Sequence, residues 1–149
     1  DKMVSSLSAL RPHRSVTDEI LAGRAAFAGA VSDLHELRAD VALGVDKAVP
    51  PGLRSQLTRA ASRFERAAEM LDTLREAGKP YPERLQTALE MAAEEIRVHA
   101  RGRYSTRRLS VHQTEKQVAR IFAELVTWQK VLSDDLLPDV LVYPRSRCG

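Results

Sequence analysis

The chain has 149 residues and a formal net charge of +3, because 23 Lys and Arg outnumber 20 Asp and Glu. Its hydrophobic content of 44% is ordinary for a soluble globular protein, and 29% charged residues with only 5% aromatics favour long helices. No apolar run approaches the ~20 residues that a membrane span needs, and no signal-peptide pattern opens the chain.

At this length we expect one domain that buries roughly two-thirds of the surface of its unfolded form. The single cysteine, Cys148, has no partner for an internal disulfide, so we expect a cytoplasmic or other reducing compartment. The sequence begins with Asp1 rather than Met, which is compatible with an excised domain or a processed product.

A first long helix is predicted over about residues 17–48, after an irregular N-terminal arm at 1–16. Ser15 lies three residues before an aspartate, which is the spacing of a side-chain cap. Arg38 interrupts the apolar stripe of this helix, so it must be paired or lie at an edge. Two consecutive prolines at 50–51 are expected to end the helix.

The second helix, predicted over about residues 53–77, carries the clearest apolar stripe in the chain. Its members follow one another at steps of three or four residues, which keeps them on one helical face. They are Leu53, Leu57, Ala60, Phe64, Ala67, Leu71 and Leu74. Gly78 is well placed to cap the end of this helix in a left-handed conformation.

Two more amphipathic helices are predicted over about 82–102 and 110–136, followed by an irregular tail at 138–149. Four helices with one apolar face each can bury those faces only against one another. The short links after the first and second helices favour antiparallel neighbours. We therefore predict an all-α fold, an up-down-up-down four-helix bundle over 17–137 with a basic connection between its third and fourth helices.

Motifs for catalysis and for metal binding are missing from the sequence. A di-metal carboxylate centre in a bundle needs Glu-x-x-His on facing helices, and none of the four histidines has an acid three residues before it. There is also no phosphate-binding glycine loop, no Gly-x-Ser-x-Gly elbow and no Cys-His nucleophile pair. The sequence therefore predicts no catalytic residue, no metal and no cofactor.

The segment from Ile96 to Thr114 is rich in arginine and contains no acidic residue. Clustered guanidinium groups attract phosphates and bind them through two parallel hydrogen bonds, and a tyrosine among them can stack on a base. The candidate polyanion- or partner-binding residues are Arg97, Arg101, Arg103, Tyr104, Arg107 and Arg108. Alternatively, these arginines pair with the acid-rich second helix or only keep a loop solvated.

His35 is a candidate phospho-acceptor. His35-Glu36-Leu37-Arg38 resembles the opening of the phospho-acceptor box of sensor histidine kinases, in which the histidine is phosphorylated and the adjacent acid assists proton transfer. The next two residues, Ala39-Asp40, depart from that box, which continues with Thr or Asn and a helix-bending proline. The alternative is that His35 is an ordinary exposed helix residue.

These patterns leave three functional hypotheses. The favoured one is a non-enzymatic helical-bundle domain, a docking or adaptor module whose partner is another protein, with self-association as a further option. The second is a nucleic-acid or other polyanion binder that acts through Arg97 to Arg108. The third is a histidine phosphotransfer-like domain that acts through His35.

Overall fold

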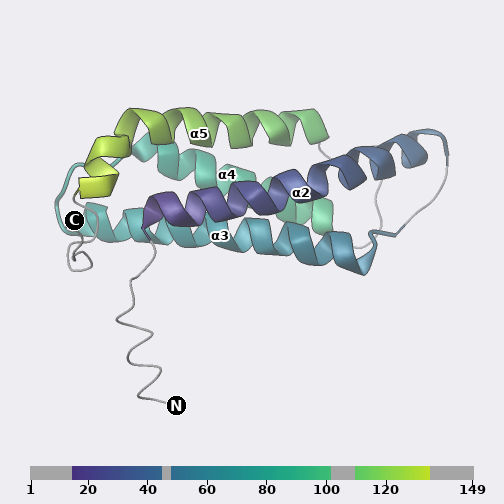
Figure 1. Ribbon diagram of the computed structural model, residues 1–149, viewed down its shortest axis with the longest axis horizontal. Coiled ribbons are helices and arrows are strands. Elements are labelled where there is room, and N and C mark those ends of the chain that lie inside the picture. The colour runs from purple at the N-terminus through teal and green to yellow at the C-terminus, as the bar shows by residue number, and fades with distance from the viewer. Residues whose placement is uncertain (1–14, 45–47, 102–109, 135–149) are drawn as a thin grey trace, which may run out of the picture.

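The computed structural model describes residues 15–44, 48–101 and 110–134. Within these ranges the chain forms four helices and no strand, so the predicted all-α fold is confirmed (Figure 1). None of these helices is long and apolar enough to cross a membrane. The helices are α2 (Val16–Ala42), α3 (Pro51–Glu76), α4 (Glu83–Ala100) and α5 (Val111–Asp134).

Each helix packs against two neighbours. α3 contacts α2 and α4, and α5 contacts α4 and α2, so the four helices close into a ring. Along every contacting pair, residue numbers rise on one helix where they fall on the other, as antiparallel neighbours require. The pairs that show this are Glu19–Arg66 and Gly29–Gln56, Asp72–Gln86 and Glu65–Arg97, Met91–Gln117 and His99–Thr114, and Arg24–Phe122 and His35–Glu115.

The start of α2 agrees with the sequence prediction, but its end does not. The Ser15 hydroxyl accepts a hydrogen bond from the backbone N–H of Asp18, and the Asp18 carboxylate accepts one from the Ser15 N–H. The helix ends at Ala42, whereas the prediction extended it to residue 48. Gly44 has φ 91°, a left-handed conformation that ends the helix before the two prolines are reached.

The other boundaries lie within two residues of the prediction. α3 begins at Pro51 because proline is tolerated in the first helical turn, where its missing N–H would have no partner anyway. Gly78, at φ 75°, ends α3 in a Schellman motif. In that motif the N–H of Gly78 bonds to the Arg75 carbonyl and the N–H of Lys79 bonds to the Leu74 carbonyl.

The predicted stripe of α3 forms the centre of the core. All seven of its members are buried, and Phe64 and Leu71 have no exposed surface. Apolar faces of the other helices cover them, with Ile20 and Leu34 from α2, Leu89 from α4 and side chains of α5 in the same cluster. Burial of a large aliphatic or aromatic side chain contributes roughly 1.5–3 kcal/mol, so this cluster supplies most of the driving force for folding.

Gly23 lets α2 approach α3 closely. A Cβ atom added at Gly23 would lie 2.7 Å from Cε1 of Phe64, well inside van der Waals contact. A Cβ atom at Gly29, less than two turns further along the same helix, would meet only the end of the Gln56 side chain, with Nε2 at 2.5 Å. The ring of Phe64 is fixed in the core, whereas the end of the partly buried glutamine side chain can turn away.

This difference predicts opposite effects for two glycine substitutions in one helix. We expect Gly29→Ala to raise the free energy of unfolding by up to about 1 kcal/mol, because alanine has the higher helix propensity. Gly23→Ala gains the same propensity, but it should lower stability by about 1–3 kcal/mol because it overpacks the core. Urea denaturation of both variants measures the difference. Equal stabilisation by both changes would contradict the close approach at Gly23.

Candidate functional site

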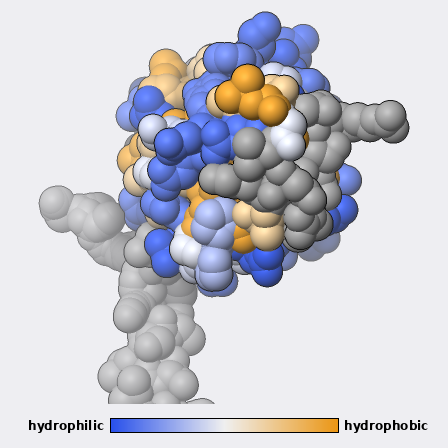
Figure 2. Space-filling view, turned by 90° about the vertical axis from the view of Figure 1, so that its right-hand side faces the viewer, coloured by the Kyte–Doolittle hydropathy of each residue, from blue (hydrophilic) through white to orange (hydrophobic). Residues whose placement is uncertain are grey.

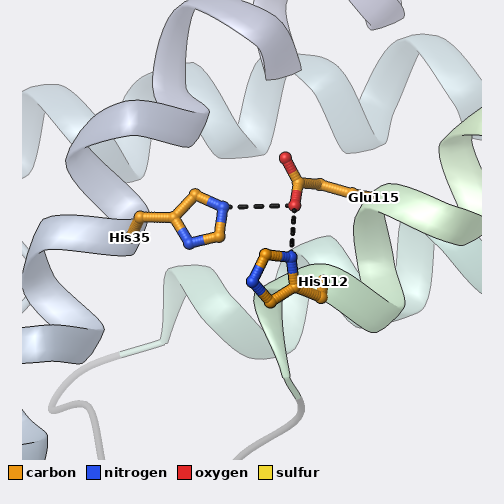
Figure 3. Close-up of side chains that lie close together, drawn as sticks. All are labelled: His35, His112 and Glu115. Atoms are coloured by element: carbon orange, nitrogen blue, oxygen red, sulfur yellow. Dashed lines mark hydrogen bonds and ion pairs between the residues drawn. The ribbon is translucent and has the colours of Figure 1, made fainter.

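Two histidines and a glutamate, on helices that are far apart in the sequence, converge where α2 meets α5. His35 comes from α2, whereas His112 and Glu115 lie three residues apart in the first turns of α5 and so share one face. The start of α5 is held by Ser110, whose hydroxyl accepts a hydrogen bond from the N–H of His112. Figure 3 shows the three side chains pointing toward one another across the seam between the helices.

One carboxylate oxygen joins the three side chains. Oε1 of Glu115 lies 3.1 Å from Nε2 of His35 and 3.2 Å from Nδ1 of His112. The two imidazole rings are 4.9 Å apart between centroids, at an interplanar angle of 49°. One metal-ligating atom from each residue lies within 4.8 Å of the other two, so the histidine–glutamate cluster (His35, His112 and Glu115) has the donor types and the spacing of a metal site.

The sequence prediction of no metal site missed this cluster. It rested on the absence of an acid three residues before a histidine and of histidine pairs at metal-ligand spacing, whereas His112 precedes Glu115 by three residues. The third member, His35, is 80 residues away from Glu115 in the chain. The spacing of His112 and Glu115 was readable, but the approach of His35 depends on how α2 and α5 pack.

The same contacts bear on His35 as a phospho-acceptor. Nε2 of His35 faces the Glu115 carboxylate at 3.1 Å, and the side chain is about one-third exposed. A phosphoryl group on that nitrogen would bring two anions together, which costs electrostatic energy. Glu115 therefore disfavours phosphorylation at Nε2.

Arg97, the first of the candidate polyanion-binding residues, is paired within the protein. Its Nε and Nη2 atoms each donate to one carboxylate oxygen of Glu65, both at 2.7 Å, and Nη2 also donates to the hydroxyl of Ser62 at 3.1 Å. The hydrogen bonds to Arg97 lower the pKa of Glu65, and the carboxylate in turn raises the pKa of Arg97. This is the pairing with the second helix that the sequence left open as an alternative.

Arg97 also lines a pocket with two further arginines. The pocket has a volume of about 310 Å³ and is bordered by Arg54 and Thr58 of α3 and by Arg97, Ala100 and Arg101 at the end of α4. Arg54 and Arg101 are exposed. We call this the arginine pocket. Figure 2 looks onto this end of the bundle, where hydrophilic surface predominates around smaller apolar areas. The remaining candidates, Arg103, Tyr104, Arg107 and Arg108, lie outside the described residues.

An apolar strip runs along the outer surface of the α2–α5 seam. The guanidinium of Arg24 lies over the ring of Phe122, with 4.3 Å from Cζ to the ring centroid. Residues three or four positions away from these two share their helical faces. The exposed ones among them are Leu21 and Ala28 on α2 and Ala119 and Val126 on α5. Together with Phe122 they form what we call the α2–α5 strip.

His99 belongs to the interior. It follows Ile96 by three residues on the apolar face of α4, and it is fully buried in a polar network between α4 and α5. The hydroxyl of Thr114 donates to Oε1 of Glu95 at 3.0 Å, and Nε2 of His99 lies 2.9 Å from the same hydroxyl. Since that hydroxyl has a single proton, it accepts from the N–H of His99. These three groups satisfy one another, and we assign them a structural role.

Comparison with known protein families, with characterised proteins and with solved structures found no match to this chain. The functional argument therefore rests on the histidine–glutamate cluster, the arginine pocket and the α2–α5 strip.

The Arg97–Glu65 pair predicts a pH-dependent contribution to stability. Because the folded state lowers the pKa of Glu65, the contribution is complete above the ordinary value of 4.5 and is lost as the pH falls through the lowered pKa. We expect Arg97→Met to lower the free energy of unfolding by about 1 kcal/mol at neutral pH, a modest effect because both side chains are over one-third exposed.

The difference between wild type and Arg97→Met should be smaller at about pH 3 than at about pH 7, because the contribution of the pair is lost as the pH falls below 4.5 through the lowered pKa of Glu65. Urea denaturation at both pH values measures it. Arg84→Met, which removes an exposed arginine from the same helix, is the control. A difference that stays constant between the two pH values would show that lost packing by the arginine stem, and not the ion pair, is responsible.

Proposed function

We propose that the chain is a non-enzymatic interaction domain that docks another protein on the α2–α5 strip. The observation that supports this is the exposure of large apolar side chains on adjoining faces of two helices, with Leu21 44% and Val126 58% exposed. Single exposed apolar residues are normal on protein surfaces, whereas neighbouring ones separated by small residues form a contact area. Ala28 and Ala119 leave room for a partner between the larger side chains.

The partner we propose is an amphipathic helix with acidic residues beside its apolar stripe. Two antiparallel helices with small residues between them form a shallow groove of the kind into which a third helix packs. Lys116 is exposed on α5, three residues before Ala119 of the strip. Arg24 adds a second cation within the strip. Acidic side chains on the partner would meet these charges and set its orientation.

The test uses a designed helical peptide with leucines at positions i, i+3, i+4 and i+7 and glutamates alongside them. We expect amide NMR shifts confined to α2 and α5, and weaker binding of an otherwise identical peptide with lysines in place of the glutamates. Leu21→Gln and Val126→Gln should each weaken binding by about tenfold, equivalent to 1.4 kcal/mol.

Met91→Gln is the matched control for this experiment. Met91 is 44% exposed, the same fraction as Leu21, but it lies on α4 and contacts Gln117 on another side of α5. The control should bind the peptide as the wild type does. Shifts spread over all four helices, or an equal loss in the control, would mean that the peptide adheres to any apolar surface and would refute the strip as a docking site.

A second candidate function is supported by the arginine pocket. Three arginines and Thr58 border one pocket, and the sequence continues from Arg101 into further arginines. Because Glu65 holds Arg97 in place, Arg54 and Arg101 are the residues whose charge is available to a phosphate group. This arrangement favours a polyanion such as a nucleic acid, held through its phosphates.

Labelled single- and double-stranded oligonucleotides test the polyanion hypothesis. Arg54→Gln combined with Arg101→Gln should weaken binding of all sequences alike and flatten the salt dependence by about one unit per lost phosphate contact. Arg59→Gln combined with Arg84→Gln removes the same charge from exposed positions outside the pocket and should have little effect. Absence of binding at ~100 μM protein in moderate salt would retire this candidate, since non-specific binders reach at least that affinity.

A further inference from the structure

We propose that the histidine–glutamate cluster binds a divalent transition metal ion, with Zn²⁺ as the ion that its donor set favours. The site would join α2 to α5 through His35 on one side and through His112 and Glu115 on the other. This inference is independent of the docking and polyanion proposals, because the three ligands belong neither to the α2–α5 strip nor to the arginine pocket.

The donor types select the class of metal. Two imidazole nitrogens and one carboxylate oxygen are the protein ligands of many zinc sites that keep a fourth position for water. Mg²⁺ and Ca²⁺ prefer shells made of oxygen alone, so two imidazoles disfavour them. Among divalent first-row ions Ni²⁺ and Cu²⁺ bind nitrogen-rich sites at least as strongly as Zn²⁺, which makes Ni²⁺ a useful second probe.

Two of the three separations between the ligand atoms are close to those that a bound ion requires. With metal–ligand bonds of about 2.0–2.1 Å, neighbouring ligand atoms of a tetrahedral site are about 3.4 Å apart. Oε1 of Glu115 is already 3.1 Å from Nε2 of His35 and 3.2 Å from Nδ1 of His112. The two imidazole nitrogens lie within 4.8 Å of each other, so rotation of the exposed His112 ring toward His35 would bring all three atoms to the distances of one ion.

Metal binding requires only a rearrangement of protons within the rings. Each neutral imidazole that ligates through the nitrogen now facing Glu115 carries its proton on the other ring nitrogen. The carboxylate exchanges two hydrogen bonds for one metal bond. The side chains of His35 and Glu115 are 36% and 37% exposed and that of His112 is 79% exposed, so an ion can enter and water can complete its shell.

Because the ligands come from two helices, the complete site exists only in the folded bundle. An ion that binds the folded state and not the unfolded one raises the melting temperature in proportion to the logarithm of its concentration. At a hundredfold excess of free Zn²⁺ over the dissociation constant, we expect the melting temperature of the full chain to rise by about 5–10 °C. Mg²⁺ at the same concentration should produce no rise.

Isothermal titration calorimetry with Zn²⁺ and with Ni²⁺ tests the site in a Cys148→Ser background, which removes the thiol as a competing ligand. We expect one ion per chain, and His35→Gln, His112→Gln and Glu115→Gln should each weaken binding by at least about tenfold. Glu36→Gln and Gln113→Ala are matched controls, since each alters an exposed direct neighbour of a ligand. Both controls should bind as the parent does.

The His35→Gln variant decides the proposal. If it binds Zn²⁺ as well as the parent, the ion is held by His112 and Glu115 alone, without a ligand from α2, and the cross-helix site is refuted. Equal binding by all three ligand variants would assign the ion to residues elsewhere in the chain and would also refute it. Circular dichroism of each metal-free variant checks that the bundle is intact.

A measurement on the unaltered protein guards against variants that fail to fold. Side-chain NMR during Zn²⁺ titration should shift the ring signals of His35 and His112 together and at the same ratio of ion to protein. The ring of His99 is fully buried and bonded to Thr114, so its signals should stay in place. Shifts at His112 without shifts at His35 would overturn the proposal.

Discussion

The burial of the α3 stripe against two neighbours at once is the constraint on which the rest of the structure depends. α3 packs against α2 on one side and α4 on the other, and Phe64 and Leu71 lose all contact with solvent. A single amphipathic helix has only marginal stability in water, so its packing rather than its propensity fixes it in place. Gly23 then sets how near α2 comes to Phe64, and the Arg97–Glu65 pair joins α4 to the flank of the same helix.

Buried polar groups fix the register between neighbouring helices, which the apolar stripes alone do not. Leucine and alanine stripes have similar shapes at successive turns, so apolar packing alone specifies the sliding position of one helix along another only weakly. Thr114 on α5 bonds to both Glu95 and His99 on α4, and a shift by one turn would leave three buried polar groups unsatisfied. This network therefore sets the register of α5, and with it the height at which His112 and Glu115 meet α2.

The α2–α5 seam closes the ring of helices. The contacts along its outer surface differ in kind from the apolar contacts of α3 with its neighbours. Polar and mixed contacts hold it together on the outside: the His35–Glu115 bond near one end, and the guanidinium of Arg24 on the ring of Phe122 further along. An interface of this kind leaves ligand-type side chains and apolar side chains accessible at the surface, while an interface made of leucine stripes hides them. The cluster and the strip lie on the same seam for that reason.

The helices could be predicted from the sequence because their signals are local. The seven-residue stripe of α3, the Ser15 cap and Gly78 each act within a few residues of themselves, and all three are confirmed. The predicted end of α2 is wrong because it relies on the two prolines, whereas Gly44 in its left-handed conformation ends the helix several residues earlier.

The candidate sites could not be predicted in this way, because they depend on the register between helices. Glu65 was among the acids expected to face the arginines, and Arg97 pairs with it through a separation of only 32 residues and one short link. His35 and Glu115 are 80 residues apart, and their meeting requires the α2–α3, α3–α4 and α4–α5 registers to be correct in turn. Periodicity identifies which face of a helix is buried, but it does not supply those three registers. The close approach at Gly23 determines the register of α2 and α3, the pairing of Arg97 determines that of α3 and α4, and the network at Thr114 determines that of α4 and α5.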